Sequence, residues 1–335
     1  MTEQELREKI NEYSRFKHNG KLTVIEDTTE FMSIDAGHVL ELEGRYYLVR
    51  GDETEPRFGL EGDPKFWVKK GIDLADGSAK IIKLVFHESF WINIAEQPIK
   101  CYRSPQKEAR ILEKVTADPY FMQGITVHDA TRNTIRIVDR IQGLCFYDYI
   151  GRIKSDHETY LRDQFCGILR NIIDCIWAMH RLHEMGELHG DIRTDHIFIE
   201  RGTGLYRWID FDYTYEWSEN PFGMDLLGLG NILLYAFGKG FYHLQDLTAW
   251  GPQGEAVLSC LAYDDLSLYS KNRVANLEKV FSYMPDCLNF VLLHFAQGAE
   301  LTYESTLELI GDLEMCMREL YPAEADRMGL LEESL

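Results

Sequence analysis

Two acidic residues with the spacing of a phosphoryl-transfer site stand near the middle of the chain. Asp191 lies in a polar loop after a long helical pattern that ends near Gly186, and Asp210 follows a short apolar run that predicts a strand. Phosphoryl transfer needs one carboxylate to accept the proton of the attacking group and another to hold the metal ion on the nucleotide phosphates. Two aspartates 19 positions apart, one after a helix and one at a strand end, suit this chemistry.

The residues around both aspartates resemble the protein-kinase-like superfamily, including its bacterial members and the Ser/Thr protein kinases. His189-Gly190-Asp191 is similar to the catalytic loop in the His-Gly-Asp form of aminoglycoside, choline and lipopolysaccharide-sugar kinases, and Asp210-Phe211-Asp212 is similar to Asp-Phe-Gly. The resemblance implies that Asp191 is the catalytic base, that Asp210 is a metal ligand and that Arg193 neutralises the transferred phosphoryl group. A His-Gly-Asp triplet alone is common, so the order and spacing of the two motifs carry the resemblance.

One position departs from this pattern. The superfamily has asparagine, a metal ligand, five residues after the catalytic aspartate, whereas this chain has His196. Mg²⁺ prefers oxygen ligands, and a neutral imidazole suits Mn²⁺, zinc or iron better. Three interpretations stay open: an enzyme with one metal ion, an enzyme that prefers Mn²⁺ and a catalytically weakened relative. His196 is a candidate second metal ligand.

A lysine suited to binding nucleotide phosphates lies on the second of two strands predicted for residues 66–70 and 79–86. These strands resemble the second and third strands of the kinase small lobe, which implies that Lys83 pairs with the phosphates. Lys80 is the competing lysine, but strand alternation puts it on the opposite face. An isolated strand lysine is more often a solvated edge residue, so the assignment of Lys83 needs support from a second element.

A helix after these strands supports the assignment of Lys83. Pro105 stands near the start of an apolar-periodic segment, 105–115, that resembles the C-helix of the superfamily. This implies that Glu108 pairs with Lys83, although a glutamate on a helix is more often simply solvated. The resemblance adds further residues to the nucleotide site, namely Val68, Ile81, Asp139, Ile141 and Phe198.

The loop before these strands matches the superfamily poorly. Residues 58–65 occupy the place of the glycine-rich phosphate loop, but they contain only Gly59 and Gly62. Glycines there let backbone N–H groups approach a phosphate closely. An ordinary turn is equally compatible with this segment.

A long helix is predicted before the catalytic loop, because the apolar residues from Tyr160 to His183 keep helical spacing. We interpret His180 and His183 as packing residues, since no cysteine or acid is spaced to complete a metal site with them.

The segment after Asp212 is short, with 12 residues before Asp225. The helix that Asp225 opens resembles the central helix of the kinase large lobe, which implies that Asp225 holds the backbone of the catalytic loop. The Ala-Pro-Glu motif of regulated protein kinases is absent from the sequence. This favours a small-molecule or lipid-sugar acceptor, or a protein acceptor that docks differently.

The predicted fold is α+β, a two-lobed protein-kinase-like architecture with a β-rich N-lobe, an N-terminal extension and a helical C-lobe. Residues 1–54 are expected to form a helix and added strands packed on the small lobe, 55–143 the N-lobe and 144–335 the C-lobe. The turn at Glu43-Gly44-Arg45 predicts a hairpin in the extension. The aromatic-rich insertion at 86–104 has no clear pattern.

Composition limits the class of partner. The formal charge of −20 argues against nucleic acid or an anionic membrane as the main partner. The seven cysteines form no CxxC pair, and the longest apolar stretch, 226–237, is about half of a bilayer span. With no apolar signal core at the N-terminus, these features predict a reduced, cytoplasmic protein.

The predicted function is an ATP-dependent phosphotransferase that moves the γ-phosphoryl group to a hydroxyl of a protein Ser/Thr or of a small molecule. ATP and Mg²⁺, or Mn²⁺, are the expected cofactors. The alternative is a pseudokinase that serves as a nucleotide-binding or protein-interaction module, which His196 and the poor glycine loop support. Transfer of AMP to a protein is a further alternative that no residue favours.

Overall fold

A computed structural model describes residues 1–14, 21–55, 62–94, 97–216 and 220–330. Gly59 of the predicted phosphate loop lies outside these ranges. The chain divides into two compact units. The β-rich unit comprises Met1–Glu88, Arg103–Asp118 and Met122–Ile141, and the helical unit comprises Ser89–Tyr102, Pro119–Phe121 and Gln142–Leu335.

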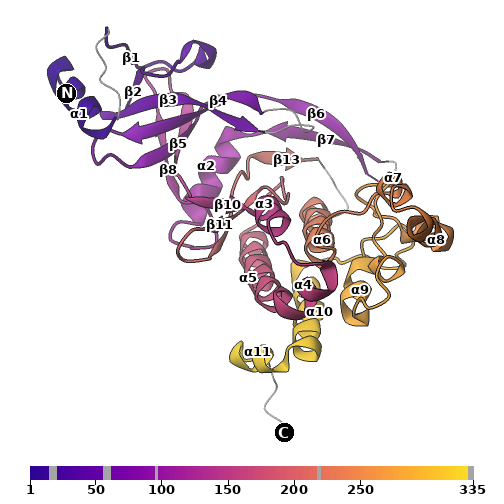
Figure 1. Cartoon of the computed structure of the whole chain (residues 1–335). Coiled ribbons are helices and arrows are strands. Elements are labelled where there is room, and N and C mark those ends of the chain that lie inside the picture. Colours follow the sequence, from indigo (N-terminus) through magenta and orange to yellow (C-terminus); the bar gives the residue numbers. More distant parts are fainter. Residues whose placement is uncertain (15–20, 56–61, 95–96, 217–219, 331–335) are drawn as a thin grey trace. The chain divides into compact units, whose positions relative to one another are not determined.

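The β-rich unit is built on a seven-stranded sheet in the order β1-β2-β3-β4-β5-β9-β8 (Figure 1). The β1–β2 pair is parallel, and the other neighbours in this sheet are antiparallel. The elements of this unit are α1 (Glu3–Tyr13), β1 (Val24–Ile25), η1 (Phe31–Ser33), β2 (Val39–Leu42), β3 (Arg45–Glu55), β4 (Asp63–Asp73), β5 (Ala79–Lys83), α2 (Pro105–Lys114), β8 (Gly124–His128) and β9 (Thr134–Asp139).

Two tight turns set the register of the first strands. Glu43 and Gly44 both have positive φ, 51° and 79°, as a two-residue hairpin turn requires, so the predicted β2–β3 hairpin is confirmed. Gly77, with φ 77°, turns the chain between β4 and β5. A Cβ atom on Gly77 would lie 2.6 Å from Cδ1 of Tyr13, so this glycine also makes room for α1.

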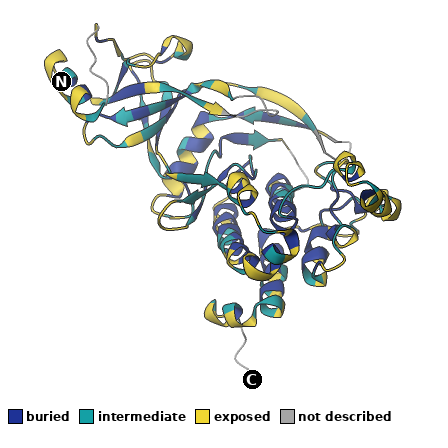
Figure 2. Cartoon of the chain, viewed as in Figure 1, coloured by how far each residue is buried: buried dark blue, intermediate teal, exposed yellow. Residues whose placement is uncertain are grey.

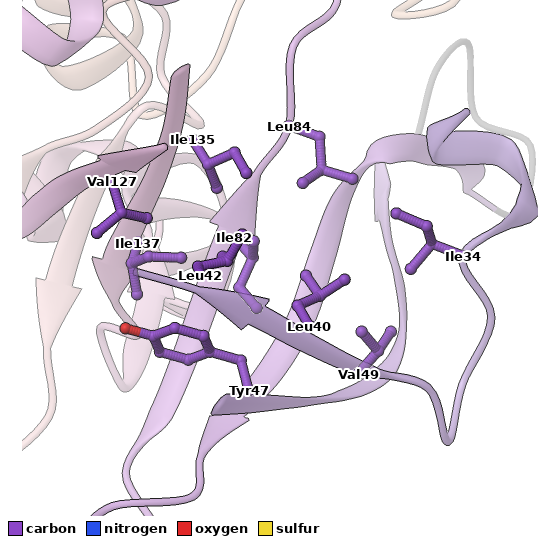
Figure 3. Close-up of a cluster of buried hydrophobic side chains, with 10 residues drawn as sticks. All are labelled: Ile34, Leu40, Leu42, Tyr47, Val49, Ile82, Leu84, Val127, Ile135 and Ile137. Carbon is purple, nitrogen blue, oxygen red and sulfur yellow. The ribbon is translucent and has the colours of Figure 1, made fainter. Parts of the chain in front are cut away.

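Apolar side chains on the two faces of this sheet form two cores. The larger one gathers side chains from β2, β3, β5, β8 and β9, and Figure 3 shows them pointing toward one another. On the second core, α1 covers strand residues with Leu6 and Ile10. Helix α1 begins after Thr2, because the Thr2 side chain caps it by accepting the Glu5 N–H in a capping box.

The helical unit contains the remaining elements. Its helices are α3 (Phe146–Gly151), α4 (His157–Asp163), α5 (Phe165–Glu184), α6 (Gly223–Phe237), α7 (Leu244–Thr248), α8 (Pro252–Cys260), η2 (Tyr263–Asp265), η3 (Leu277–Lys279), α9 (Asp286–Leu293), α10 (Thr306–Leu320) and α11 (Pro322–Arg327). Its strands are β6 (Ser89–Ile94), β7 (Gln97–Arg103), β10 (Gly143–Cys145), β11 (Ile197–Glu200), β12 (Tyr206–Trp208) and β13 (Tyr213–Tyr215).

Two features of the helical unit differ from or add to the sequence-based expectation. The predicted helix from 160 to 183 is broken, because Gln164 leaves helical geometry (φ −127°) between α4 and α5. The insertion at 86–104 forms the antiparallel hairpin β6–β7. This hairpin adds β13, directly after Asp212, as its third strand.

The helix α6 is buried along most of its length, as Figure 2 shows. Among the described residues, no helix has both the length and the apolar character needed to cross a membrane. The order of strands, α2, two further strands and then helices confirms the predicted α+β class with a β-rich N-terminal part and a helical C-terminal part.

Candidate active site

The loop at 189–196, which the sequence predicts to be the catalytic loop, is held by one buried aspartate. The Asp225 carboxylate at the start of α6 accepts the backbone N–H of His189 (2.6 Å) and of Gly190 (2.8 Å). His183, at the end of α5, donates from Nε2 to the same carboxylate (2.9 Å). Burial opposes the charge of Asp225, but the hydrogen bonds from His183 and from the loop lower the pKa of its carboxyl. The predicted role of Asp225 in holding the loop backbone is confirmed, and His183 is its partner as well as a packing residue.

Asp191 follows this fixed segment. Its side chain is 15% exposed, and its backbone N–H donates to Nδ1 of His189 (3.2 Å). Burial raises the pKa of the Asp191 carboxyl, while the charges of His196 and Arg193 oppose that rise. A carboxylate with a raised pKa is a better proton acceptor at neutral pH than an ordinary aspartate.

His196 lies between the two aspartates of the sequence motifs. Its Nδ1 donates to the backbone carbonyl of Asp191 (2.8 Å) and lies 3.4 Å from a carboxylate oxygen of the same residue. Its Nε2 lies 3.7 Å from Oδ2 of Asp210. Because a carbonyl oxygen only accepts, the proton belongs on Nδ1, and in the neutral ring the lone pair of Nε2 faces Asp210.

Asp210 stands at a strained position after β12. Its φ of 61° is in the left-handed region, which aspartate tolerates better than most residues. The next residue, Phe211, is fully buried and packs edge-on against His189 (5.9 Å between ring centroids) and Phe121 (6.3 Å). The buried phenylalanine therefore ties the position of Asp210 to the catalytic loop.

Arg193 contacts an acidic neighbour. Its guanidinium forms two hydrogen bonds to the carboxylate of Asp195, at 3.0 and 2.5 Å. Asp195 was not among the predicted site residues, although its position two residues after the arginine was an available signal.

In the β-rich unit, a second cluster gathers around Glu108. Lys83 pairs with Oε1 of Glu108, and Arg136 donates from Nε to its Oε2 (2.9 Å). The Glu108 side chain has no exposed surface, and that of Lys83 is 5% exposed. The predicted pairing of Lys83 with Glu108 is thus present in the structure, while their binding of a nucleotide stays a prediction. Arg136 was missed, and its only signal was a charged residue within the apolar strand 134–138.

Four other predicted nucleotide-binding residues lie on or next to strands of the β-rich unit. Val68 lies opposite Lys83 in the β4–β5 register, and Ile81 lies two residues before Lys83 on the same strand face. Asp139 and Ile141 lie at and after the end of β9, where Asp139 pairs with Lys80 at 2.5 Å. Lys80 is therefore engaged elsewhere, as its position on the opposite face predicted.

Phe198 belongs to the helical unit. It is partly buried on β11, opposite Cys145 of β10 and Arg207 of β12. Asp191, His196 and Asp210 are thus brought together in the helical unit, whereas Lys83, Glu108, Val68 and Ile81 share neighbouring positions in the β-rich unit.

The donor atoms near Asp210 fit a metal ion that arrives with a nucleotide. Within the described ranges, no three side chains of His, Cys, Asp or Glu are gathered so as to hold a metal ion by themselves. Protein sites for Mg²⁺ at nucleotides commonly use one or two carboxylates and take further oxygens from the phosphates. Asp210 fits this description, and Nε2 of His196 adds a nitrogen that suits Mn²⁺ better.

The sequence matches no family model, and it matches no curated protein. The structure is similar to that of the kinase PK-1 of Cydia pomonella granulovirus, with a TM-score of 0.48 and 13% sequence identity. The similarity covers 79% of this chain and 92% of that one. A likeness at this level concerns the fold alone.

Proposed function

We propose that this chain is an ATP-dependent phosphotransferase that transfers the γ-phosphoryl group to a hydroxyl of a protein Ser/Thr or of a small molecule. The observation that carries the proposal is the loop geometry. Asp225 holds the N–H groups of His189 and Gly190, and the loop then brings Asp191 beside His196 and Asp210.

In this proposal Asp191 accepts the proton of the acceptor hydroxyl. The hydroxyl oxygen forms a bond to the γ-phosphorus, the bond from that phosphorus to the bridging oxygen breaks, and ADP leaves. The raised pKa of Asp191 suits it to take up the proton. Arg193 and Lys83 would stabilise the negative charge of the phosphates.

Asp210 and His196 would hold the metal ion that accompanies ATP, Mg²⁺ or Mn²⁺. The ion would neutralise charge on the phosphates. The imidazole of His196 makes Mn²⁺ the better candidate of the two on ligand preference.

The first test is a thermal shift with ATP plus either metal, on the wild type, on Asp210→Ala and on the control Asp163→Ala. Asp163 is an exposed aspartate paired with Arg162, so its replacement removes a carboxylate away from the site. A ligand at a hundred times its Kd adds about 2.7 kcal/mol to the free energy of unfolding. We expect a metal-dependent shift in the wild type and the control that Asp210→Ala loses. No shift with either metal would contradict nucleotide binding.

One observation favours a second candidate, a pseudokinase. The two nitrogens of the His196 ring lie within ion-pair distance of the carboxylates of both aspartates, so the ring itself bridges the two side chains that a metal ion would otherwise bridge. His196→Asn tests this. If the wild type is a pseudokinase, we expect it to show no transfer from labelled ATP and the variant to gain Mg²⁺-dependent binding of ATP. If the chain is an enzyme, wild-type transfer is present, and the variant moves its metal preference from Mn²⁺ toward Mg²⁺.

We also propose a cytoplasmic location. The seven cysteines are free thiols, which is the usual state in a reducing compartment. Cell fractionation tests this location.

A further inference from the structure

A second arginine of the helical unit, Arg273, contacts residues that in turn pack on the catalytic loop. Within the described parts of the chain, Arg273 takes part in no ion pair, whereas Arg193 is paired with Asp195. Its guanidinium donates to the side-chain oxygen of Asn231 and lies flat over the ring of Phe241, 3.6 Å from the centroid. Its Nε is buried and has no hydrogen-bond partner among the residues that the structure describes. In a chain with a formal charge of −20, an uncompensated and partly buried cation is unusual.

Two structural routes connect Arg273 with the catalytic loop. The first runs along α6. A Cβ atom on Gly228 would lie 2.6 Å from Cβ of Ile192, the residue after Asp191, so α6 approaches the loop closely there. Asn231 lies one helical turn further along α6 and binds Arg273. The residue that binds the arginine is therefore about one helical turn from the contact between α6 and the catalytic loop.

The second route is a row of aromatic rings. The backbone N–H of Tyr147 donates to the carbonyl of Thr194 in the catalytic loop (3.0 Å), and the Tyr147 ring stacks on that of Tyr235. The Tyr235 ring contacts Phe241 at 4.9 Å between centroids, and Phe241 lies under Arg273. The row thus leads from the catalytic loop to the guanidinium.

Tyr269 is influenced by the charges of both the catalytic loop and Arg273. It precedes a tight turn in which the Arg273 N–H donates to the carbonyl of Ser270 (2.9 Å). Partial burial raises the pKa of the Tyr269 phenol, and the charges of Asp191, Arg193 and Arg273 all act on it. The residue is 46% exposed, so Tyr269 is accessible to a ligand.

We propose that Arg273 and Tyr269 form the acceptor subsite and bind an oxyanion, a carboxylate or a phosphate monoester, on the molecule whose hydroxyl faces Asp191. This inference rests on the proposed function. Because Nε is buried and Nη1 already donates one hydrogen bond to Asn231, the edge of the planar fork formed by Nη1 and Nη2 is the part left to bind such a group in a bidentate manner. The net negative charge of the chain does not exclude a ligand with one anionic group, because the positive charge of Arg273 would lie directly beside that group.

The test measures binding of sn-glycerol 3-phosphate and of D-glycerate by calorimetry without nucleotide, with uncharged glycerol as the reference. The two anionic probes distinguish a phosphate from a carboxylate ligand. The variants are Arg273→Gln, Arg273→Lys and the matched control Arg162→Gln, which removes an exposed arginine paired with Asp163. We expect at least one anionic probe to bind the wild type and the control more tightly than glycerol does. Arg273→Gln should weaken that binding about tenfold or more.

Arg273→Lys keeps the charge but loses the planar fork, so we expect an intermediate loss and a folded chain even if the glutamine variant does not fold. Binding of glycerol as tight as that of both anions, or unchanged binding in both Arg273 variants, would overturn the subsite.

A thermal shift with ATP and metal on the same variants separates the two proposals. We expect this shift to be unchanged in the Arg273 variants. A shift lost with Arg273 would assign the arginine to the nucleotide instead. If the wild type itself shows no ATP shift, the proposed function fails, and Arg273-dependent anion binding would then be no acceptor subsite.

Discussion

Glu108 in the β-rich unit and Asp225 in the helical unit are both buried carboxylates, but different kinds of partner satisfy them. Glu108 is flanked by the side-chain cations Lys83 and Arg136. Asp225 accepts two backbone N–H groups and one imidazole. The first arrangement pairs a carboxylate with two side-chain cations, so it balances charge. The second fixes a backbone path, so its loss changes the position of every group on the catalytic loop.

The largest expected effect comes from breaking the backbone arrangement. Asp225→Ala leaves two buried N–H groups and His183 without their acceptor, and we expect the free energy of unfolding to fall by about 3–5 kcal/mol. Phosphoryl transfer should be lost as well, because Asp191 would no longer be held in place. Urea unfolding and transfer of labelled phosphate from ATP measure the two effects. Asp163→Ala is the control, and equal stability of the two variants would contradict the role of Asp225.

Breaking the charge-balanced cluster should cost somewhat less. Glu108→Gln removes the buried carboxylate charge that Lys83 and Arg136 share, and we expect a loss of about 3 kcal/mol in urea unfolding. Lys80→Ala is the matched control, because it removes a lysine of the same strand whose partner, Asp139, is 59% exposed. That pair should contribute under about 1 kcal/mol. Similar losses in the two variants would show that the Glu108 cluster is no stronger than a surface ion pair.

The smallest effect is a difference in pH dependence. The pKa of Asp225 is lowered in the folded chain, so its stabilisation is fully present above the ordinary aspartate pKa of about 3.9 and is lost as the pH falls through the folded value. Asp174 on α5 has the opposite sign, because burial raises the pKa of its carboxyl. Its ionisation therefore costs stability as the pH rises from about 3.9 through the folded value.

Urea unfolding across this pH range on Asp225→Asn and Asp174→Asn sharpens the comparison. At neutral pH we expect Asp225→Asn to be less stable than the wild type and Asp174→Asn to be at least as stable. Both differences should shrink in acid. Differences that do not change with pH would contradict the assigned pKa directions.

The parts of the site that lie within one motif were predictable from the sequence. The place of Asp225 at a helix start predicted that it holds the backbone at His189 and Gly190, and the structure confirms this contact, whereas the catalytic role of Asp191 and Asp210 stays a prediction. The pair of Lys83 and Glu108 followed from the order of a strand and a helix.

The contacts that depend on strand order or on distant loops were not predictable. Arg136 reaches Glu108 because β9 pairs with β5 across a long stretch of chain, and its register opposite Lys83 appears only in the folded sheet. Arg273 approaches the catalytic loop through Asn231 and Phe241, which no periodic pattern connects with it. The break at Gln164 was missed because apolar spacing continues through it.

The three-stranded sheet β13-β7-β6 has a consequence for how the segment after Asp212 can move. Its ladder is made of main-chain hydrogen bonds, and the Glu216 N–H continues the contact to the carbonyl of Lys100 (3.0 Å). Strand β13 can move away only if its hydrogen bonds to β7 break. The amide hydrogens of β13 and of β7 should therefore exchange with similar protection factors. Within this segment, residues 213–216 are therefore held in place by main-chain hydrogen bonds to β7.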